Sequence, residues 1–141
     1  MKKIVYFLIA LLPLAMACNS DDRQTTKTTS DNDIDAARNF IQAALVGDYD
    51  KARTFMVNDS LNQGHIGAIE RLNERLSQQE RDKYKSASIR IHKDRKLNDS
   101  TSVVHYSNSY RNKIDSLKVM RVNGKWLVDF KFMFSKNDSL P

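Results

Sequence analysis

The fold is decided by residues 116–131, which read SLKVMRVNGKWLVDFK. Asn123 and Gly124 stand near the middle of this stretch. A two-residue type I′ turn needs positive φ at both of its positions, and Asn followed by Gly satisfies that need best. Apolar and polar residues alternate on either side of the pair, which is typical of β-strands. The stretch therefore predicts an antiparallel hairpin whose register is set by the turn.

The predicted register sorts the hairpin into two faces. One face pairs Val122 with Lys125, Met120 with Leu127, Lys118 with Asp129, and Ser116 with Lys131. The other face pairs Arg121 with Trp126, Val119 with Val128, and Leu117 with Phe130. We expect the second, apolar face to continue through Phe132 and Phe134 and to face the core. Asp129 then points away from the core, so the inner row of the last strand carries no carboxylate.

The same period of two appears earlier in the chain. Ala87, Ile89 and Ile91 alternate with polar residues and predict a first strand. Residues 98–100 read Asn-Asp-Ser and predict a turn, after which residues 101–111 form a second strand. A looser turn at residues 112–115 leads into the third strand, which ends at Val122. The sheet therefore has about four antiparallel strands.

Before the strands, apolar residues recur at helical spacing. Ala37, Phe40, Ile41, Ala44 and Leu45 share one face of a helix that starts near Asp33. Asp31 or Asp33 is expected to cap its start and Gly47 to end it, and Asp48 is expected to cap a short second helix. That second helix turns Tyr49, Ala52, Phe55 and Met56 inward. A third helix is predicted from about His65 to Lys83, with Ile66, Ile69, Leu72 and Leu76 on its buried stripe.

These elements predict one α+β domain over residues 33–135, in which about three helices pack on one side of a curved antiparallel sheet. The chain of 141 residues is long enough for one such domain. Residues 136–141 form a short C-terminal tail.

The N-terminus has the pattern of a bacterial export signal. Met1-Lys2-Lys3 is positively charged, residues 4–12 are apolar, and Ala15-Met16-Ala17 precedes Cys18. The apolar run is shorter than the roughly 20 residues that a permanent membrane helix needs. We therefore expect residues 1–17 to be a signal peptide that is removed.

Cys18 is the only cysteine, so it forms no internal disulfide. Its position after the cleavage site resembles the lipobox of bacterial lipoproteins, with Ala15 at the place where that family carries leucine. The resemblance implies a diacylglyceryl thioether on Cys18, and several acyl chains together hold a protein firmly on a membrane. The alternative is cleavage by the ordinary signal peptidase, which would leave a soluble protein with a free N-terminal thiol.

Residues 18–32 are expected to form the lipidated cysteine and a flexible tether. Residues 19–32 contain no aliphatic or aromatic side chain whose burial could offset the entropy cost of ordering the chain. Ser20, Asp21 and Asp22 resemble the acidic signal that exports lipoproteins of the Bacteroidota to the cell surface. The expected location is the outer membrane, with the domain facing either the periplasm or the outside.

The net charge of the chain is +6, from 23 basic and 17 acidic residues. Lys2 and Lys3 belong to the signal, so 21 basic residues remain against 17 acidic ones, which is +4. Basic and acidic residues are interleaved from Arg38 to Lys136, with no run of five like charges. This pattern indicates a solvated surface, and we expect no nucleic-acid partner.

Two segments carry a resemblance to a known fold family. Residues 40–52 read FIQAALVGDYDKA and residues 122–129 read VNGKWLVD, and both resemble small bacterial lipoproteins with a nuclear transport factor 2-like, or cystatin-like, domain. The resemblance implies a cone in which the sheet curves around the helices. The same fold hosts ketosteroid isomerase and scytalone dehydratase, which carry acid–base residues in the cavity of the cone. Neither segment contains a catalytic motif.

The sequence offers few candidates for chemistry. His92 and His65 are predicted at the surface, while the facing of His105 is left open by Val103 and Val104. Stacking of Arg121 on Trp126 within the sheet is expected. The candidate pocket-lining residues are Tyr106, Tyr110, Trp126 and Phe130. We expect no metal site, no cofactor and no catalytic residue, because zinc-ligand spacings, an EF-hand pattern, phosphate loops and nucleophile motifs are all lacking.

These observations leave two classes of function. The first is a non-catalytic binding or accessory module that docks an envelope protein through the open end of the cone or the exposed sheet face. The second is a cavity for a small apolar ligand, with or without chemistry of the isomerase or dehydratase kind. A cavity of several hundred cubic ångströms with a buried His or Asp favours the second class.

Overall fold

The computed structural model describes residues 29–135. The helices are α1 (Asp33–Val46), α2 (Tyr49–Thr54), α3 (Ser60–Glu74) and α4 (Gln78–Lys85). The strands β1 (Ile89–Asn98), β2 (Thr101–Asn108), β3 (Asp115–Val122) and β4 (Lys125–Asp129) follow, and a 3-10 helix, η1 (Phe130–Phe134), comes last. The strands form one antiparallel sheet in the order β1-β2-β3-β4. The predicted α+β class is confirmed.

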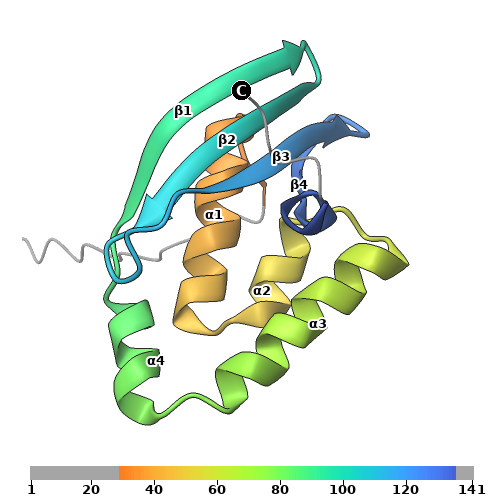
Figure 1. Cartoon of the computed structure of the whole chain (residues 1–141). Coiled ribbons are helices and arrows are strands. Elements are labelled where there is room, and N and C mark those ends of the chain that lie inside the picture. Colours follow the sequence, from red (N-terminus) through yellow and green to blue (C-terminus); the bar gives the residue numbers. More distant parts are fainter. Residues whose placement is uncertain (1–28, 136–141) are drawn as a thin grey trace, which may run out of the picture.

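The helices lie on one side of the sheet, with α1 against it (Figure 1). α1 contacts all four strands, and η1 packs against both β3 and α3. Register shifts in β1, between Ile91 and Lys93 and between Lys96 and Asn98, interrupt its pairing with β2. Such irregularities bend a strand and increase its twist, which accounts for the curve of the sheet over α1.

The hairpin forms as the sequence predicts at its turn. Asn123 and Gly124 have φ values of 49° and 78°, and five predicted pairs are present, from Val122 with Lys125 to Lys118 with Asp129. The predicted pairs of Ser116 with Lys131 and Leu117 with Phe130 are wrong, because β4 ends at Asp129 and the chain turns into η1.

A hydrogen-bond network ends β4. The Asn62 side chain accepts from the Lys131 backbone N–H at 2.7 Å and donates to the Asp129 and Asp59 carboxylates at 3.1 and 2.9 Å. The Lys131 ammonium also reaches Asp129, at 2.5 Å. These bonds pull the end of the strand onto the first turn of α3. As a result, Asp129 is buried against α3. It pairs with Lys118 as predicted, but the expectation that it points away from the core is wrong.

The turn into η1 also changes the fate of the last aromatic residues. Phe130 is buried, but Phe132 is only half-buried and Phe134 is 45% exposed, stacked on His65 at 4.2 Å. The expectation that Phe132 and Phe134 continue the inner face is therefore wrong, because the strand alternation that would turn them inward stops at Asp129.

The predicted third helix is two helices. α3 starts at Ser60, where Asp59 caps it, and ends at Glu74. α4 begins after Ser77, whose side chain and backbone exchange hydrogen bonds with Glu80 in a capping box. The apolar spacing that runs through to Leu76 conceals this break. Leu72, which was expected on the buried stripe, is 56% exposed.

The starts of the first two helices are only partly as expected. Asn32, rather than Asp31 or Asp33, caps α1 by accepting from the Asp35 backbone N–H at 2.9 Å. Gly47 ends α1 with φ 81°, and Asp48 caps α2, as predicted. Tyr49, Ala52, Phe55 and Met56 are all buried, as predicted.

Asp33 has a different role at the start of α1. Its carboxylate is buried and is bonded by the Lys96 ammonium and the Ser102 hydroxyl, which joins the helix to β1 and β2. Burial on its own raises the pKa of the Asp33 carboxyl, but the bonds from Lys96 and Ser102 outweigh it and hold that pKa below its usual value.

Candidate functional site

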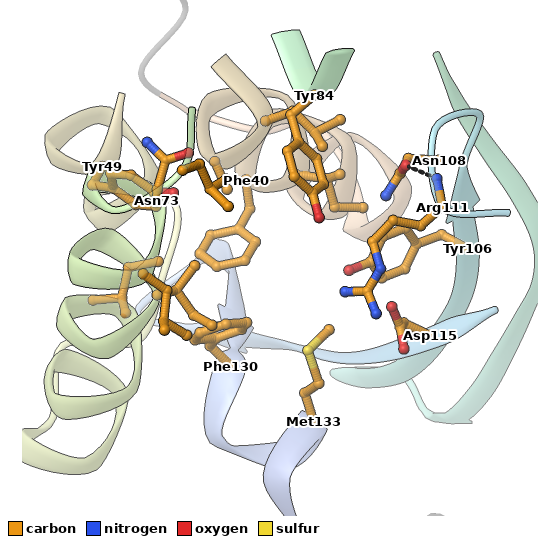
Figure 2. Close-up of a pocket in the computed structure, with 17 residues that line it drawn as sticks. Phe40, Tyr49, Asn73, Tyr84, Tyr106, Asn108, Arg111, Asp115, Phe130 and Met133 are labelled. Atoms are coloured by element: carbon orange, nitrogen blue, oxygen red, sulfur yellow. Dashed lines mark hydrogen bonds between the residues drawn. The ribbon is translucent and has the colours of Figure 1, made fainter. Parts of the chain in front are cut away.

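A cavity of about 270 Å³ lies between the helices, the inner face of the sheet and η1. Every helix, the strands β2 and β3, and the turn between them contribute to its lining (Figure 2). The lining residues are Phe40, Ile41, Ala44, Leu45, Tyr49, Ile66, Ile69, Leu72, Asn73, Leu76, Tyr84, Tyr106, Asn108, Arg111, Asp115, Phe130 and Met133.

Most of the lining is aliphatic or aromatic. The Phe40 and Phe130 rings meet at a centroid distance of 5.1 Å and form part of the floor. Ile66 lines the cavity from α3 and is fully buried. Leu72 and Arg111 are exposed and lie at the mouth, so the cavity opens to solvent.

Tyr49 brings a phenol into this mostly apolar wall. Burial raises its pKa to about 12, and the negative charge of Glu70 and the neighbouring Tyr84 add to the effect. The Tyr49 phenol is therefore neutral across the physiological range and acts as a hydrogen-bonding group only.

The polar groups gather at the other end of the cavity. Tyr106 and Asn108 come from the end of β2, Arg111 from the following turn and Asp115 from the start of β3, and Figure 2 shows them together. The Tyr84 hydroxyl points into the cavity from α4 (Figure 2). The charged lining residues thus lie where β2 passes into β3, while the helices contribute mostly apolar side chains apart from Tyr49, Asn73 and Tyr84.

Of the four residues expected in a pocket, two line this cavity, Tyr106 and Phe130. Tyr110 does not, because β2 ends at Asn108 and the strand alternation that would turn Tyr110 inward stops there. It is 37% exposed, and its ring meets Tyr84 edge-on at 4.8 Å.

Trp126 also lies outside the lining. It is half-buried at the end of the sheet near the β3–β4 turn, on the same face as Val128. The predicted stacking of Arg121 on this ring is confirmed, with the guanidinium 6.0 Å from the ring centre, and the Lys96 ammonium lies at the same distance.

The histidines are all outside the cavity lining. His105 lies on the opposite face of β2 from Tyr106, and its Nδ1 is 2.8 Å from the Ser116 hydroxyl on β3. His92 is exposed, as predicted, with its Nε2 2.8 Å from the Ser107 hydroxyl. His65 lies within α3 and is half-buried under Phe134, rather than at a helix start on the surface.

Sequence reasoning missed the polar end of the cavity. The signal for Asp115 was present, since Asp115, Leu117 and Val119 alternate along the third strand and the latter two are inner-face residues. Arg111 had no such signal, because it lies in a turn whose shape depends on Asn108 accepting from the Arg111 backbone N–H at 2.9 Å.

Cys18 and the residues Ser20, Asp21 and Asp22 lie outside the described residues, so their roles stay predictions. Within residues 29–135, no helix has the length and apolar character to cross a membrane. In the same range, no three or more His, Cys, Asp or Glu side chains converge as a metal ion would require.

Comparison with protein-family models, with curated proteins and with solved structures found no match to this chain. The cavity and its chemistry are therefore the observations from which a function is inferred.

Proposed function

We propose that this protein is a lipid-anchored, non-catalytic binding module of the cell envelope and that its ligand is a small, mostly apolar molecule held in the cavity. The observation that carries the proposal is the cavity of about 270 Å³, with an apolar wall and a few polar groups at one end. Small-molecule sites have this composition, and at about 270 Å³ the cavity is close to the lower end of their usual range of about 300–1,000 Å³, which fits a small ligand. The cavity favours a small ligand over a docked protein as the primary partner.

The anchor in this proposal rests on Cys18 and the export signal before it. A lipid on Cys18 would hold the domain at the outer membrane, on its periplasmic or its outer side, with residues 18–32 as the tether. A nuclear transport factor 2-like cone belongs to the same proposal, supported by the helices that precede a curved antiparallel sheet.

Binding without chemistry is supported by the lining itself. No His, Cys or Lys is among the described residues that line the cavity, and Asp115 is its one carboxylate. Asp115 is only half-buried and lies 3.6 Å from the Lys113 ammonium. A general base of the isomerase kind needs a carboxylate that is poised inside the cavity, so an acid–base enzyme is the weaker alternative.

The test measures binding of 1-octanol to the Cys18→Ser protein by isothermal titration calorimetry, with and without a larger side chain that fills the cavity. Ala44 lines the cavity from α1, so Ala44→Trp is expected to abolish binding. Gln42 is exposed on the same helix, so Gln42→Trp adds the same ring outside the cavity and is the matched control. Saturable binding that survives Ala44→Trp, or no binding to the parent protein, would contradict the proposal.

A further inference from the structure

The polar end of the cavity holds a hydroxyl that the fold leaves unused. Tyr106 is only 9% exposed, and among residues 29–135 its hydroxyl has no hydrogen-bond partner. Figure 2 shows the Tyr106 hydroxyl directed into the cavity. The hydroxyl opens onto the cavity, so a ligand group that enters there can accept its proton.

The Tyr106 phenol is a donor at neutral pH. Burial raises its pKa above the ordinary value for tyrosine, and the negative charge of Asp115 adds to this effect, so the proton stays on the oxygen. A neutral phenol facing a ligand donates its proton best to an anionic or strongly polar acceptor.

Asn108 offers a second donor beside it. Its Oδ1 accepts from the backbone N–H groups of Tyr110 and Arg111 at 3.1 and 2.9 Å. These two bonds fix the amide so that its Nδ2 group faces away from the turn, toward the cavity (Figure 2). They also hold the turn that carries the Arg111 side chain.

The charge at this end of the cavity is unevenly compensated. Asp115 has the Lys113 ammonium 3.6 Å away. Arg111 has no carboxylate oxygen within 4.0 Å among residues 29–135. The Arg111 guanidinium therefore forms no ion pair among residues 29–135, while Asp115 lies at the same end of the cavity (Figure 2), and a guanidinium matches a carboxylate with two parallel hydrogen bonds.

We infer that the ligand is an amphipathic monocarboxylate, with its carboxylate at Arg111, Tyr106 and Asn108 and its apolar part along Phe40, Phe130 and Met133. This inference rests on the proposed function and names the class of its ligand. Two cations, Arg111 and Lys113, stand against one carboxylate, Asp115, at this end, so a single negative charge on the ligand balances it and a second does not. That charge balance selects a carboxylate over a phosphate monoester.

The experiment compares ligands of one chain length by calorimetry at pH 7.5: octanoate, 1-octanol and octyl phosphate, each with the Cys18→Ser protein. Octanoate is expected to bind about tenfold or more tighter than 1-octanol, since hydrogen bonds to charged groups are the stronger ones. Octyl phosphate is expected to bind more weakly than octanoate.

Variants assign the preference to the named residues. Arg111→Gln is expected to weaken octanoate by about tenfold or more and to change 1-octanol by less than about twofold. Tyr106→Phe is expected to weaken octanoate alone, by about threefold to tenfold. Arg90→Gln makes the same substitution at an exposed position on β1, outside the lining, and is expected to leave the octanoate preference in place.

The outcomes separate this inference from the proposed function. If octanoate and 1-octanol bind equally and Arg111→Gln changes neither, the ligand is not a carboxylate, while the apolar cavity still binds. Tighter binding of octyl phosphate than of octanoate would also overturn the carboxylate assignment. If neither octanoate nor 1-octanol binds, the proposed function fails and the inference fails with it.

Discussion

Asn62→Ala should strongly destabilise the fold, because Asn62 joins the start of α3 to the end of β4. Its side chain is fully buried and makes hydrogen bonds to Asp59, to Asp129 and to the backbone of Lys131. Alanine would leave the Lys131 N–H without its partner and would take one donor from each carboxylate. A buried donor left unpaired costs about 1–3 kcal/mol, and each further bond adds about 1 kcal/mol.

The expected loss is therefore about 3–5 kcal/mol in the free energy of unfolding. Urea denaturation followed by circular dichroism measures it, and at a slope of about 2 kcal/mol per molar the midpoint falls by about 1.5–2.5 M. Gln63→Ala is the matched control, since within residues 29–135 the adjacent Gln63 side chain bonds only to Asn58, at the surface. Its expected loss is within about 0.5 kcal/mol.

The same variant should loosen one wall of the cavity, because η1 begins directly after Asp129 and carries Phe130 and Met133. A loss below about 1 kcal/mol for Asn62→Ala, or an equal loss for Gln63→Ala, would refute the view that this network holds η1 in place.

Four further predictions concern separate parts of the chain. Asp33→Asn should destabilise the protein at pH 7, and its deficit should shrink in urea melts as the pH falls below about 4, because a carboxyl with a lowered pKa stabilises the fold only while it is ionised. Gly64→Ala, inside α3 with open space at the added methyl, should raise the free energy of unfolding by about 0.5–1 kcal/mol, whereas Gly124→Ala, at φ 78°, should lower it; effects of the same sign would contradict the turn geometry. Trp126→Ala should cost about 2 kcal/mol, less than the 3–5 kcal/mol or so of a fully buried ring, because Trp126 is half-buried. Cys18→Ser should move the protein from the membrane fraction to the soluble fraction, and unchanged fractionation would argue against the lipid anchor.

The elements that local sequence specifies were the most predictable. Asn123 and Gly124 fix their turn without outside help, and the register follows from the turn. Gly47 and Asp48 mark the end of α1 and the start of α2 in the same local way.

The errors arise where distant residues decide the local structure. β4 stops at Asp129 because Asn62, 67 positions earlier, holds that side chain. The local alternation of apolar and polar residues does not indicate that the strand ends there. The break before α4 had a local signal, the capping pair of Ser77 and Glu80, but the apolar spacing around it favoured a continuous helix.

The cavity shows the same division. Phe130 could be expected there because it follows the inward alternation of β4, although it is the first residue of η1, and the facing of Tyr106 was left open by its strand. Tyr110 and Trp126 could not be excluded without knowing where β2 ends and which end of the sheet the helices cover. The position of Arg111 depends on the turn after β2, which is held by the hydrogen bond from the Arg111 backbone N–H to the Asn108 side chain.

The measurement that tests the central claim most directly is a methyl NMR titration of the Cys18→Ser protein with 1-octanol. The account predicts saturable shifts at the methyl groups of Ile41, Ile69 and Met133, which line the cavity, and none at Met120 on the opposite face of the sheet. Shifts that do not saturate, or that are as large at Met120 as at Met133, would contradict a binding cavity between the helices and the sheet.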